Sequence, residues 1–366
     1  MNETAPTKDS KATLRRGWTT GACAAAAAAA AAEALLSGHF PDPVEISLPG
    51  GQRPAFPLVE RSLSADLARA GVTKDAGDDP DVTHGATVLA SVRRLPEGRD
   101  VAFKAGPGVG TVTLPGLPLA VGEPAINPAP RALIAETLAA VARRHGSHGG
   151  FEVEIAIPGG EALAAKTLNG RLGIKGGLSI LGTTGIVVPY SCASWIHSIH
   201  RGIDVARAAG IEHALGATGA TSERAGQAAL GLSEQALIDM GDFAGGMLKY
   251  LRRHPIPKVT IAGGFAKLGK LAQGAVDLHS ARSRVDLPAL RAALADLGAE
   301  ASTRRAASET VSAAQILSLA EAARLPLGAW VAQAARTRAQ ALAGDQVAVS
   351  VLVYDRAGRE VGRAGL

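Results

Sequence analysis

The sequence has few of the residues that mark several protein classes. Only two cysteines, Cys23 and Cys192, occur among 366 residues, far apart and without a Cys-x-x-Cys spacing. This excludes a disulfide framework and a cysteine-based zinc site, and it favours the reducing cytoplasm. Aromatic residues make up 3% of the chain, so its hydrophobic cores must consist mainly of Ala, Val, Leu and Ile.

Long apolar runs and targeting signals are also missing. The longest apolar run near the N-terminus, residues 22–32, stops at Glu33 and is shorter than the roughly 20 residues of a membrane span. The first dozen residues are polar and lack the pattern of a signal peptide. We therefore predict no membrane association, and we expect residues 1–13 to form a disordered tail.

The charge of the chain is not concentrated in any segment. The net charge is +5, but Lys and Arg are scattered, few aromatics lie between them, and no nucleic-acid-binding motif is present. A basic protein without such a patch is better suited to a small anion than to nucleic acid. We expect a polycarboxylate or a phosphorylated small molecule as the ligand.

Apolar residues and glycine are abundant. The length predicts two domains of ordinary size, and an apolar fraction of 47% is enough to fill two cores. The 44 glycines concentrate in short loops after apolar runs. This pattern is typical of an α/β protein with Gly-rich ligand loops.

An acidic stretch from residue 74 to residue 88 stands out. It combines Gly and Pro with Asp75, Asp78, Asp79, Asp81 and His84, and the apolar run after it, residues 86–92, predicts a β-strand. A turn that enters a strand can direct such side chains toward one ligand. Taken alone, a solvated acidic turn at the tip of a hairpin is the better interpretation.

An alanine-rich helix is predicted near the N-terminus. Thr19 or Thr20 can cap a helix that starts near Gly21, and residues 37–38, Ser-Gly, can end it. Its all-alanine surface predicts a tightly packed core helix. The helix start is different, because Arg15, Arg16, two threonines and free backbone N–H groups together predict an anion site.

Two Gly-rich segments follow in the same half. Residues 106–131 are too rich in Gly and Pro for a helix or a central strand, so they form either a functional loop or a wide connection. Gly182, Thr183, Thr184 and Gly185 lie between two β-like runs. They are interpreted as a ligand-binding turn, although a tight hairpin turn would have the same sequence.

The C-terminal half repeats one pattern three times. The apolar runs 211–215, 236–240 and 258–262 each end in a Gly-containing loop that precedes a predicted helix. This is the βα unit of a parallel sheet, which binds ligands at the carboxyl ends of its strands. No loop fits G-x-G-x-x-G, so a nicotinamide fingerprint is absent. Helices are predicted for residues 286–343 and a final strand for 347–355.

Five motifs in order resemble those of the CbiD-type cobalt-precorrin-5B methyltransferases of cobalamin biosynthesis. They are LRRGWTTGACAAAA, KDAGDDPDVTHGA, VGEPAINPAPR, KTLNGRLGIKGGLSILGTTGIV and KVTIAGGFAKLGKLAQG. The resemblance covers residues 14–280. It departs from the family after GTTGIV, where Val188-Pro189-Tyr190-Ser191-Cys192 stands in place of Lys-Pro and acidic residues, and near Gly263, where a His is common.

The resemblance implies a reaction and a fold. The reaction is S-adenosylmethionine-dependent methylation of C-1, which gives cobalt-precorrin-6A in the anaerobic pathway. The fold is α/β with two domains. Residues 14–188 are expected to form an α+β domain with a mixed sheet that binds the substrate. Residues 189–366 are expected to form a Rossmann-like α/β domain with parallel strands that binds the cofactor.

The chemistry of this reaction assigns roles to residues of the motifs. Arginine forks suit the substrate's carboxylates, and imidazole titrates near neutral pH, so His84 is a candidate proton carrier. The candidate catalytic residues are Asp78, Asp79 and His84. The candidate substrate-binding residues are Arg16, Thr19, Thr20, Gly21, Lys74, Asp75, Asp81, Asn127 and Asn169. The candidate cofactor-binding residues are Gly182, Thr183, Thr184, Gly185, Gly216, Gly219, Asp242, Gly263 and Gly264.

Methyl transfer from a sulfonium is an in-line displacement that needs alignment and exclusion of water, not a protein nucleophile. We therefore interpret both cysteines as structural thiols in packed helices. The acidic turn does not have EF-hand spacing, so we predict no metal site, with cobalt only inside the substrate. We expect Asp78–His84, Gly182–Gly185 and the helix start at Gly21 to meet at one pocket.

Two other functions remain open at this stage. The protein could carry a tetrapyrrole intermediate without converting it, or it could be a phosphate- or nucleotide-binding α/β enzyme. The sequence leaves open which Gly loop binds the methyl donor, which group accepts the proton, and whether the substrate contains cobalt. It is also silent on the oligomeric state, so a homo-oligomer is not excluded.

Overall fold

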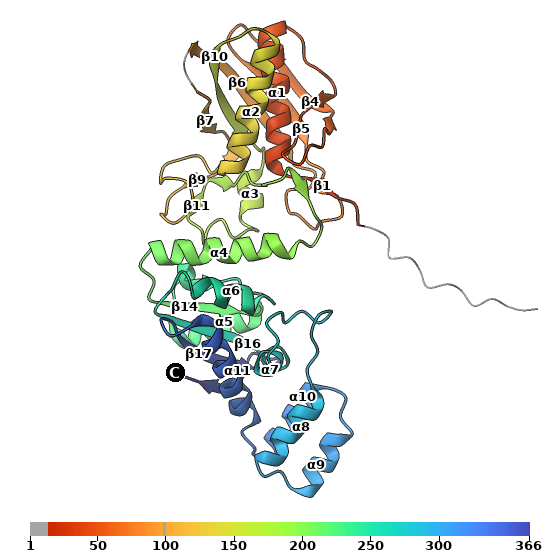
Figure 1. Ribbon diagram of the computed structural model, residues 1–366, viewed down its shortest axis with the longest axis vertical. Helices are drawn as coiled ribbons and strands as arrows, with labels where there is room; N and C mark the ends of the chain where they lie inside the picture. The colour runs from red at the N-terminus through yellow and green to blue at the C-terminus, as the bar shows by residue number, and fades with distance from the viewer. Residues whose placement is uncertain (1–13, 98–99) are drawn as a thin grey trace, which may run out of the picture. The chain divides into compact units, whose positions relative to one another are not determined.

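The computed structural model describes residues 14–97 and 100–366, so the predicted tail at residues 1–13 lies outside the described residues. Contacts divide the chain into two compact units (Figure 1). Of the described residues, unit 1 contains 14–97, 100–113 and 118–191, and unit 2 contains 114–117 and 192–366. The main division follows Ser191, close to the predicted boundary after residue 188.

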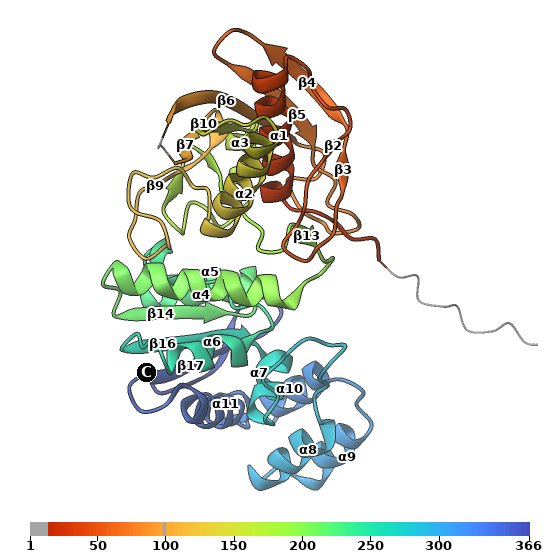
Figure 2. The ribbon, with the colours of Figure 1, turned by 45° about the horizontal axis from the view of Figure 1, so that its top comes forward.

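Two parallel helices form the centre of unit 1. Helix α1 (Thr20–Ser37) begins at the N-cap Thr19 and ends at Gly38, whose φ of 83° is left-handed. The predicted cap, alanine helix and stop are therefore confirmed. Helix α2 (Pro128–Arg144) lies beside α1 in both views (Figures 1 and 2). By length and composition α1 could cross a membrane, but 78% of it is buried within the structure, as a core helix would be.

The main sheet of unit 1 has the strand order β4-β5-β6-β10-β7. Its strands are β4 (Leu58–Leu63), β5 (Ala68–Thr73), β6 (Thr87–Glu97), β7 (Ala102–Ala105) and β10 (Gly149–Ala156). All neighbours pair antiparallel except β10 and β7, which are parallel, so the sheet is mixed. The sequence analysis missed the β4–β5 hairpin. Only Leu58 of β4 is buried, so the strand lacks the alternating apolar pattern.

In the described part of unit 1, four pairs of short strands connect loop segments by hydrogen bonds. They are β1 (Gly17–Trp18) with β13 (Ile186–Val187), β2 (Val44–Glu45) with β3 (Ala55–Phe56), β8 (Gly108–Val109) with β12 (Gly177–Leu178), and β9 (Thr111–Val112) with β11 (Ile174–Lys175). A short helix, α3 (Gly160–Ala164), precedes β11. The Gly- and Pro-rich loop 106–131 contains β8 and β9.

Unit 2 is built on a sheet with the order β15-β14-β16-β17-β18. The strands are β14 (His213–Ala217), β15 (Leu237–Ile238), β16 (Lys258–Gly264), β17 (Ala348–Tyr354) and β18 (Glu360–Ala364). The first four strands in this order are parallel and β18 is antiparallel. The prediction that β17 ends the fold was wrong, because a tight turn at Asp355–Arg359 returns the chain as β18. Of the predicted strand at 236–240 only Leu237–Ile238 form a strand, which follows the 3-10 turn η1 (Glu234–Ala236).

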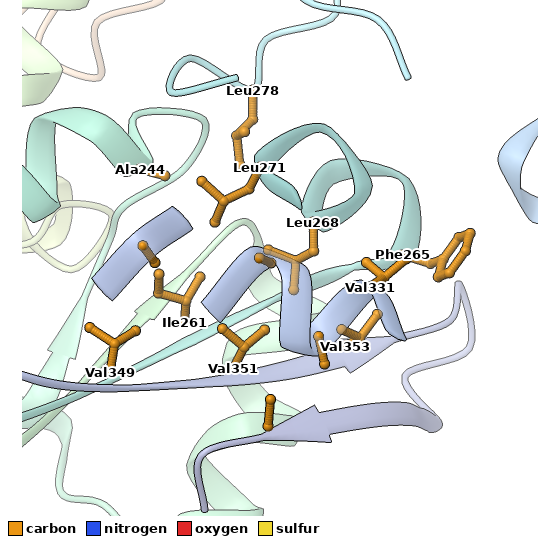
Figure 3. Packing of buried hydrophobic residues seen from close by; sticks show 14 of the residues in the cluster. Ala244, Ile261, Phe265, Leu268, Leu271, Leu278, Val331, Val349, Val351 and Val353 are labelled. Atoms are coloured by element: carbon orange, nitrogen blue, oxygen red, sulfur yellow. The ribbon is translucent and has the colours of Figure 1, made fainter. Parts of the chain in front are cut away.

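Helices connect and cover this sheet. They are α4 (Cys192–Ala208), α5 (Ala220–Leu230), α6 (Ala244–Leu251), α7 (Phe265–Ala272), α8 (Leu287–Asp296), α9 (Ala301–Ser308), α10 (Ala313–Ala322) and α11 (Leu327–Ala343). On one face, Val349, Val351 and Val353 of β17 pack against Leu268 of α7 and Val331 of α11 (Figure 3). The other face carries Leu215, Leu352 and Tyr354 under residues of α5.

The order in which helices connect the strands of unit 2 creates a crevice at the carboxyl ends of two neighbouring strands. The chain leaves β14 through α5 toward β15, on one side of β14, whereas it leaves β16 through α7 toward β17, on the other side. β14 and β16 are neighbours, so their connections diverge at their carboxyl ends. In open α/β sheets, ligands bind at such a switch point.

Candidate active site

The acidic loop of unit 1 connects β5 to β6 and contacts two other predicted segments. Trp18 donates its backbone N–H to Asp75 O at 2.7 Å, and Asp78 donates to Arg15 O at 3.0 Å. On the other side of this N-terminal segment, Thr19 donates to Gly185 O at 2.9 Å. The acidic loop, the start of α1 and the Gly182–Gly185 loop therefore adjoin one another, while a pocket shared by the three segments stays a prediction.

Two aspartates of this loop hold the N-terminal segment. The Asp75 carboxylate pairs with the Arg15 guanidinium through both oxygens, one of them 2.9 Å from Nη2. This hydrogen-bonded arginine, with the Gly77 N–H, lowers the pKa of Asp75 to about 2. The Asp78 carboxylate accepts the Arg15 backbone N–H at 2.6 Å. Both carboxylates therefore stabilise the position of the N-terminal segment against the acidic loop.

Lys74 and Asp81 do not have the exposure expected of substrate ligands. The Lys74 side chain is only 2% exposed and is paired with the Asp81 carboxylate and the Thr83 hydroxyl. Burial would raise the pKa of Asp81, but the Lys74 charge and the hydrogen bonds lower it overall. The sequence placed both residues in the substrate site. Their enclosed ion pair instead stabilises the loop itself.

His84 has one ring nitrogen engaged. Its Nδ1 lies 3.1 Å from the backbone N–H of Ala76 and accepts that proton. The neutral ring must then carry its hydrogen on Nε2. A base needs a free lone pair, and the only lone pair of this tautomer is occupied. His84 is therefore suited to donate a hydrogen bond through Nε2, which argues against the proton-accepting role that we predicted.

The start of α1 is not an open anion site. The Thr19 hydroxyl accepts the Ala22 N–H at 3.2 Å, and the Leu181 carbonyl accepts the Gly21 N–H at 3.1 Å. Thr19 and Thr20 are buried, and a Cβ on Gly21 would lie 3.0 Å from Pro130. The expectation of free N–H groups was wrong for Gly21 and Ala22, because the distant Leu181 carbonyl and the local Thr19 hydroxyl accept them.

The two asparagines are also engaged within unit 1. Asn127 precedes α2 and donates through its side-chain amide to Ile180 O at 3.1 Å. Asn169 is 7% exposed and donates to Gly177 O at 3.1 Å. Arg16 differs from both, because it is exposed and forms no ion pair among residues 14–97 and 100–366. It is a predicted substrate ligand that is both accessible and without an ion-pair partner in the described part of the chain.

Close packing accounts for both glycines of the 182–185 loop. A Cβ on Gly182 would overlap the Thr19 side chain, and a Cβ on Gly185 would lie 2.6 Å from Leu48. Gly185 also has a φ of 82°, which favours glycine. Thr183 and Thr184 are exposed. The structure thus gives the glycines a packing reason, while contact of this loop with the methyl donor stays a prediction.

Unit 2 contains a pocket of about 720 Å³ at the switch point described above. Loops after three parallel strands line it: residues 218–222 after β14, residues 264–267 after β16, and residues 354–357 after β17. The first residues of α10 complete the wall, and α10 packs beside α7 (Figure 2). The N-terminal ends of α5, α7 and α10 therefore all border the pocket, and their dipoles each place partial positive charge there.

Two features of this pocket are suited to ligand binding, a buried hydroxyl and two glycines. The Tyr354 side chain is 3% exposed, and its hydroxyl has no hydrogen-bond partner within the described residues. Burial, more than the charge of Glu360, raises the pKa of Tyr354, so the phenol keeps its proton and can donate it. Gly219 and Gly264 border open space, since nothing lies within 4 Å of a Cβ built on either.

The other predicted cofactor residues lie behind the pocket. A Cβ on Gly216 would overlap the Met247 side chain, and one on Gly263 would lie 2.8 Å from Thr218. These glycines permit packing within the sheet. Asp242 forms an ion pair at 2.8 Å with Lys267, although the geometry is not that of a directed hydrogen bond. Lys267 lines the pocket and also donates to Thr218 O at 2.9 Å.

Sequence reasoning missed most of the pocket wall. The rule that strands of a parallel sheet end at ligands could have identified Tyr354 and Asp355, because they follow the predicted last strand. No sequence signal marked Ser312, Leu317 or Glu321 of α10, which reach the pocket only through folding. Within the described residues, no cluster of three or more His, Cys, Asp or Glu side chains could hold a metal ion.

Only one of the predicted structural thiols is fully packed. Cys23 is buried in α1, and burial raises its pKa to about 12. Cys192 begins α4, is only partly buried, and accepts a hydrogen bond from Arg282 at 2.9 Å. The prediction of a packed helical thiol therefore holds for Cys23 and fails for Cys192.

Comparisons with known proteins give consistent matches. The CbiD family profile matches residues 7–189, and the profile "CbiD, C-terminal domain" matches residues 277–365. A cobalt-precorrin-5B C(1)-methyltransferase of Paramagnetospirillum magneticum is 60% identical over 96% of this chain and 98% of its own length. One of Rhodospirillum rubrum is 60% identical over 98% of this chain and 99% of its own length.

A solved structure is also similar. It is the crystal structure of a cobalamin biosynthesis protein (cbiD) from Archaeoglobus fulgidus, 29% identical, which covers 69% of this chain and 77% of the other chain with a TM-score of 0.39.

Proposed function

The chain belongs to the CbiD family, and we infer from this that it is a cobalt-precorrin-5B C(1)-methyltransferase. It is an enzyme of cobalamin biosynthesis that transfers a methyl group to C-1 of a corrin precursor. The observation that carries this conclusion is 60% identity over nearly the whole chain to methyltransferases of that name. We propose that the product is cobalt-precorrin-6A and that the enzyme works in the cytoplasm.

We propose S-adenosylmethionine as the methyl donor and the pocket of unit 2 as its site. The donor has an anionic carboxylate, a cationic sulfonium and ammonium, and a nucleoside. The N-termini of α5, α7 and α10 suit the carboxylate. The unpartnered Tyr354 hydroxyl suits an acceptor of the nucleoside or the carboxylate. Gly219 and Gly264 leave room for close approach, so the residues present fit this group.

When bound, the donor supplies an electrophilic methyl group, and the corrin ring supplies the nucleophilic carbon. The protein has to hold and orient the ligands and exclude water. In unit 1, we propose that Arg16 and the Nε2–H of His84 bind carboxylates of the substrate. Asp78 and Asp79 each use one oxygen for a backbone N–H, so each keeps the other oxygen as a candidate proton acceptor.

A transfer assay tests the proposed function. The protein is incubated with cobalt-precorrin-5B and S-adenosylmethionine labelled in the methyl group, and the products are analysed by mass spectrometry. We expect the label in a singly methylated corrinoid, with strong loss of activity in the Tyr354→Phe variant through weaker donor binding. Retained but unmethylated corrinoid would instead identify a carrier of tetrapyrrole intermediates.

A further inference from the structure

Three large apolar side chains are exposed in residues 181–190 of unit 1, a segment that we call the apolar strip and that contacts the acidic loop through the Tyr190 N–H and Asp79. Leu181, Val188 and Tyr190 are 54%, 48% and 67% exposed, respectively. Within this segment, residues 186–187 pair antiparallel with residues 17–18, with Val187 opposite Gly17. Arg16 and Val188 are the residues that directly adjoin this last pair along the chain. The strip therefore combines apolar side chains with the accessible guanidinium.

Tyr190 is held in an unusual backbone conformation. Its φ is 55°, a left-handed value that bulky residues rarely adopt. Its N–H donates to the Asp79 carboxylate at 2.8 Å, so an aspartate of the acidic loop fixes the conformation. Residues kept in such sparsely populated conformations cluster at functional sites. The strain would be relieved by glycine, which the chain uses elsewhere but not here.

We propose that the face of the substrate's macrocycle rests on the phenol ring of Tyr190, with Asp79 as the positioning residue. This inference rests on the proposed function. The substrate is a broad conjugated ring edged by carboxylates, and an aromatic side chain is suited to pack against such a face. Arg16 adjoins the Gly17–Val187 pair, and His84 belongs to the acidic loop whose Asp79 accepts the Tyr190 N–H; the guanidinium and the Nε2–H are donors suited to the carboxylate rim.

A protein partner on the apolar strip would make different contacts from those of the macrocycle. A second copy of the chain would cover Leu181, Val188 and Tyr190 without a need for the guanidinium of Arg16. The accessible positive charge beside the apolar side chains favours an anionic macrocycle over a protein surface. The left-handed Tyr190 also points to selection for a side chain in one place, which a generic apolar contact does not require.

The test uses the full-length enzyme with Tyr190→Gly and Tyr190→Ala, and with Leu63→Ala as the matched control. Leu63 is 42% exposed on β4 of the same unit, away from the acidic loop. We expect both Tyr190 variants to raise the KM for the corrinoid at least tenfold, with kcat within about twofold and unchanged affinity for S-adenosylmethionine. Leu63→Ala should change none of these values.

Stability separates this role from a structural one. Tyr190→Gly removes the left-handed strain, so its Tm should equal or exceed that of the wild type while corrinoid binding weakens. A lower Tm, an unchanged KM, or a change of oligomeric state in sedimentation would each overturn the proposal. Asp79→Ala should also raise the KM, and Asp79→Asn should restore it, because the amide oxygen still accepts the Tyr190 N–H.

A binding measurement keeps the inference independent of turnover. Tyr190→Trp places a fluorophore on the strip, and titration with cobyrinic acid, a corrin that retains its carboxylates, should quench its emission saturably. If the wild type showed no methyl transfer but quenching occurred, the proposed function would fail and the binding site would stand. Absence of quenching in an active enzyme would overturn the binding site alone.

Discussion

Substitution by alanine should destabilise the protein at Gly263 but not at the adjacent Gly264. A Cβ on Gly263 would lie 2.8 Å from Cγ2 of Thr218 and 2.9 Å from Cγ of Leu268, whereas a Cβ on Gly264 would meet nothing within 4 Å. Thr218 and Leu268 are both buried, at 6% and 0% exposure, so neither side chain can easily move away. Gly264 opens into the pocket.

The expected magnitudes follow from this difference. Overpacking should lower the free energy of unfolding of Gly263→Ala by about 1–3 kcal/mol. Gly264→Ala should change it by no more than about 0.5 kcal/mol, because its φ of −65° suits any residue. Gly264→Leu should fill part of the pocket and raise the Kd for S-adenosylmethionine at least about tenfold, which corresponds to about 1.4 kcal/mol.

Urea unfolding and titration calorimetry with S-adenosylmethionine measure the two effects separately. The reasoning would be refuted if both alanine variants lost the same stability, since the packing difference would then be absent. It would also be refuted if folded Gly264→Leu bound the donor as tightly as the wild type, because the donor would then lie elsewhere. Val311→Ala, a change at an 83% exposed side chain, is the neutral control.

Three further changes concern unit 1. The pKa of Asp75 is lowered to about 2, so its stabilising effect is present above the unfolded pKa of about 4 and is lost as pH falls toward 2. Because the side chain is 44% exposed, we expect a stabilisation of about 1 kcal/mol or less. Arg15→Gln should abolish this stabilisation, and an acid unfolding curve that is unchanged in that variant would contradict the prediction. Thr19→Ala should cost about 0.5–2 kcal/mol through loss of the helix cap, measured as a lower Tm, and an unaltered Tm would argue against the cap. Lys74→Met should lower the free energy of unfolding by up to about 3 kcal/mol, because Asp81 loses its buried partner. In urea unfolding, the double variant with Asp81→Asn should recover part of this loss. Additive losses would show that the two residues are not coupled.

Elements with local signals could be predicted from the sequence. The alanine helix was correctly delimited, because its cap, its helix-forming interior and its Gly38 stop lie within one segment. The parallel strands of unit 2 were found since each is apolar and precedes a Gly loop. Strands such as β4, with a single buried residue, carry no comparable pattern and were missed.

The sites were harder to predict because they depend on distant contacts. Lys74 appears in the sequence as a charged residue beside aspartates, and only the fold shows that its ammonium is enclosed with Asp81. The helix start at Gly21 was predicted to have free N–H groups, but residue 181 supplies the acceptor. The residues of α10 that line the pocket share it with Tyr354, although they precede Tyr354 in the chain by more than one element.

Hydrogen–deuterium exchange with S-adenosylhomocysteine, the demethylated donor, tests most directly whether the donor occupies the crevice between β14 and β16. The account predicts protection of peptides that contain residues 218–222, 264–267 and 354–357. Protection confined to peptides around Gly182–Gly185, with none in these three loops, would contradict it.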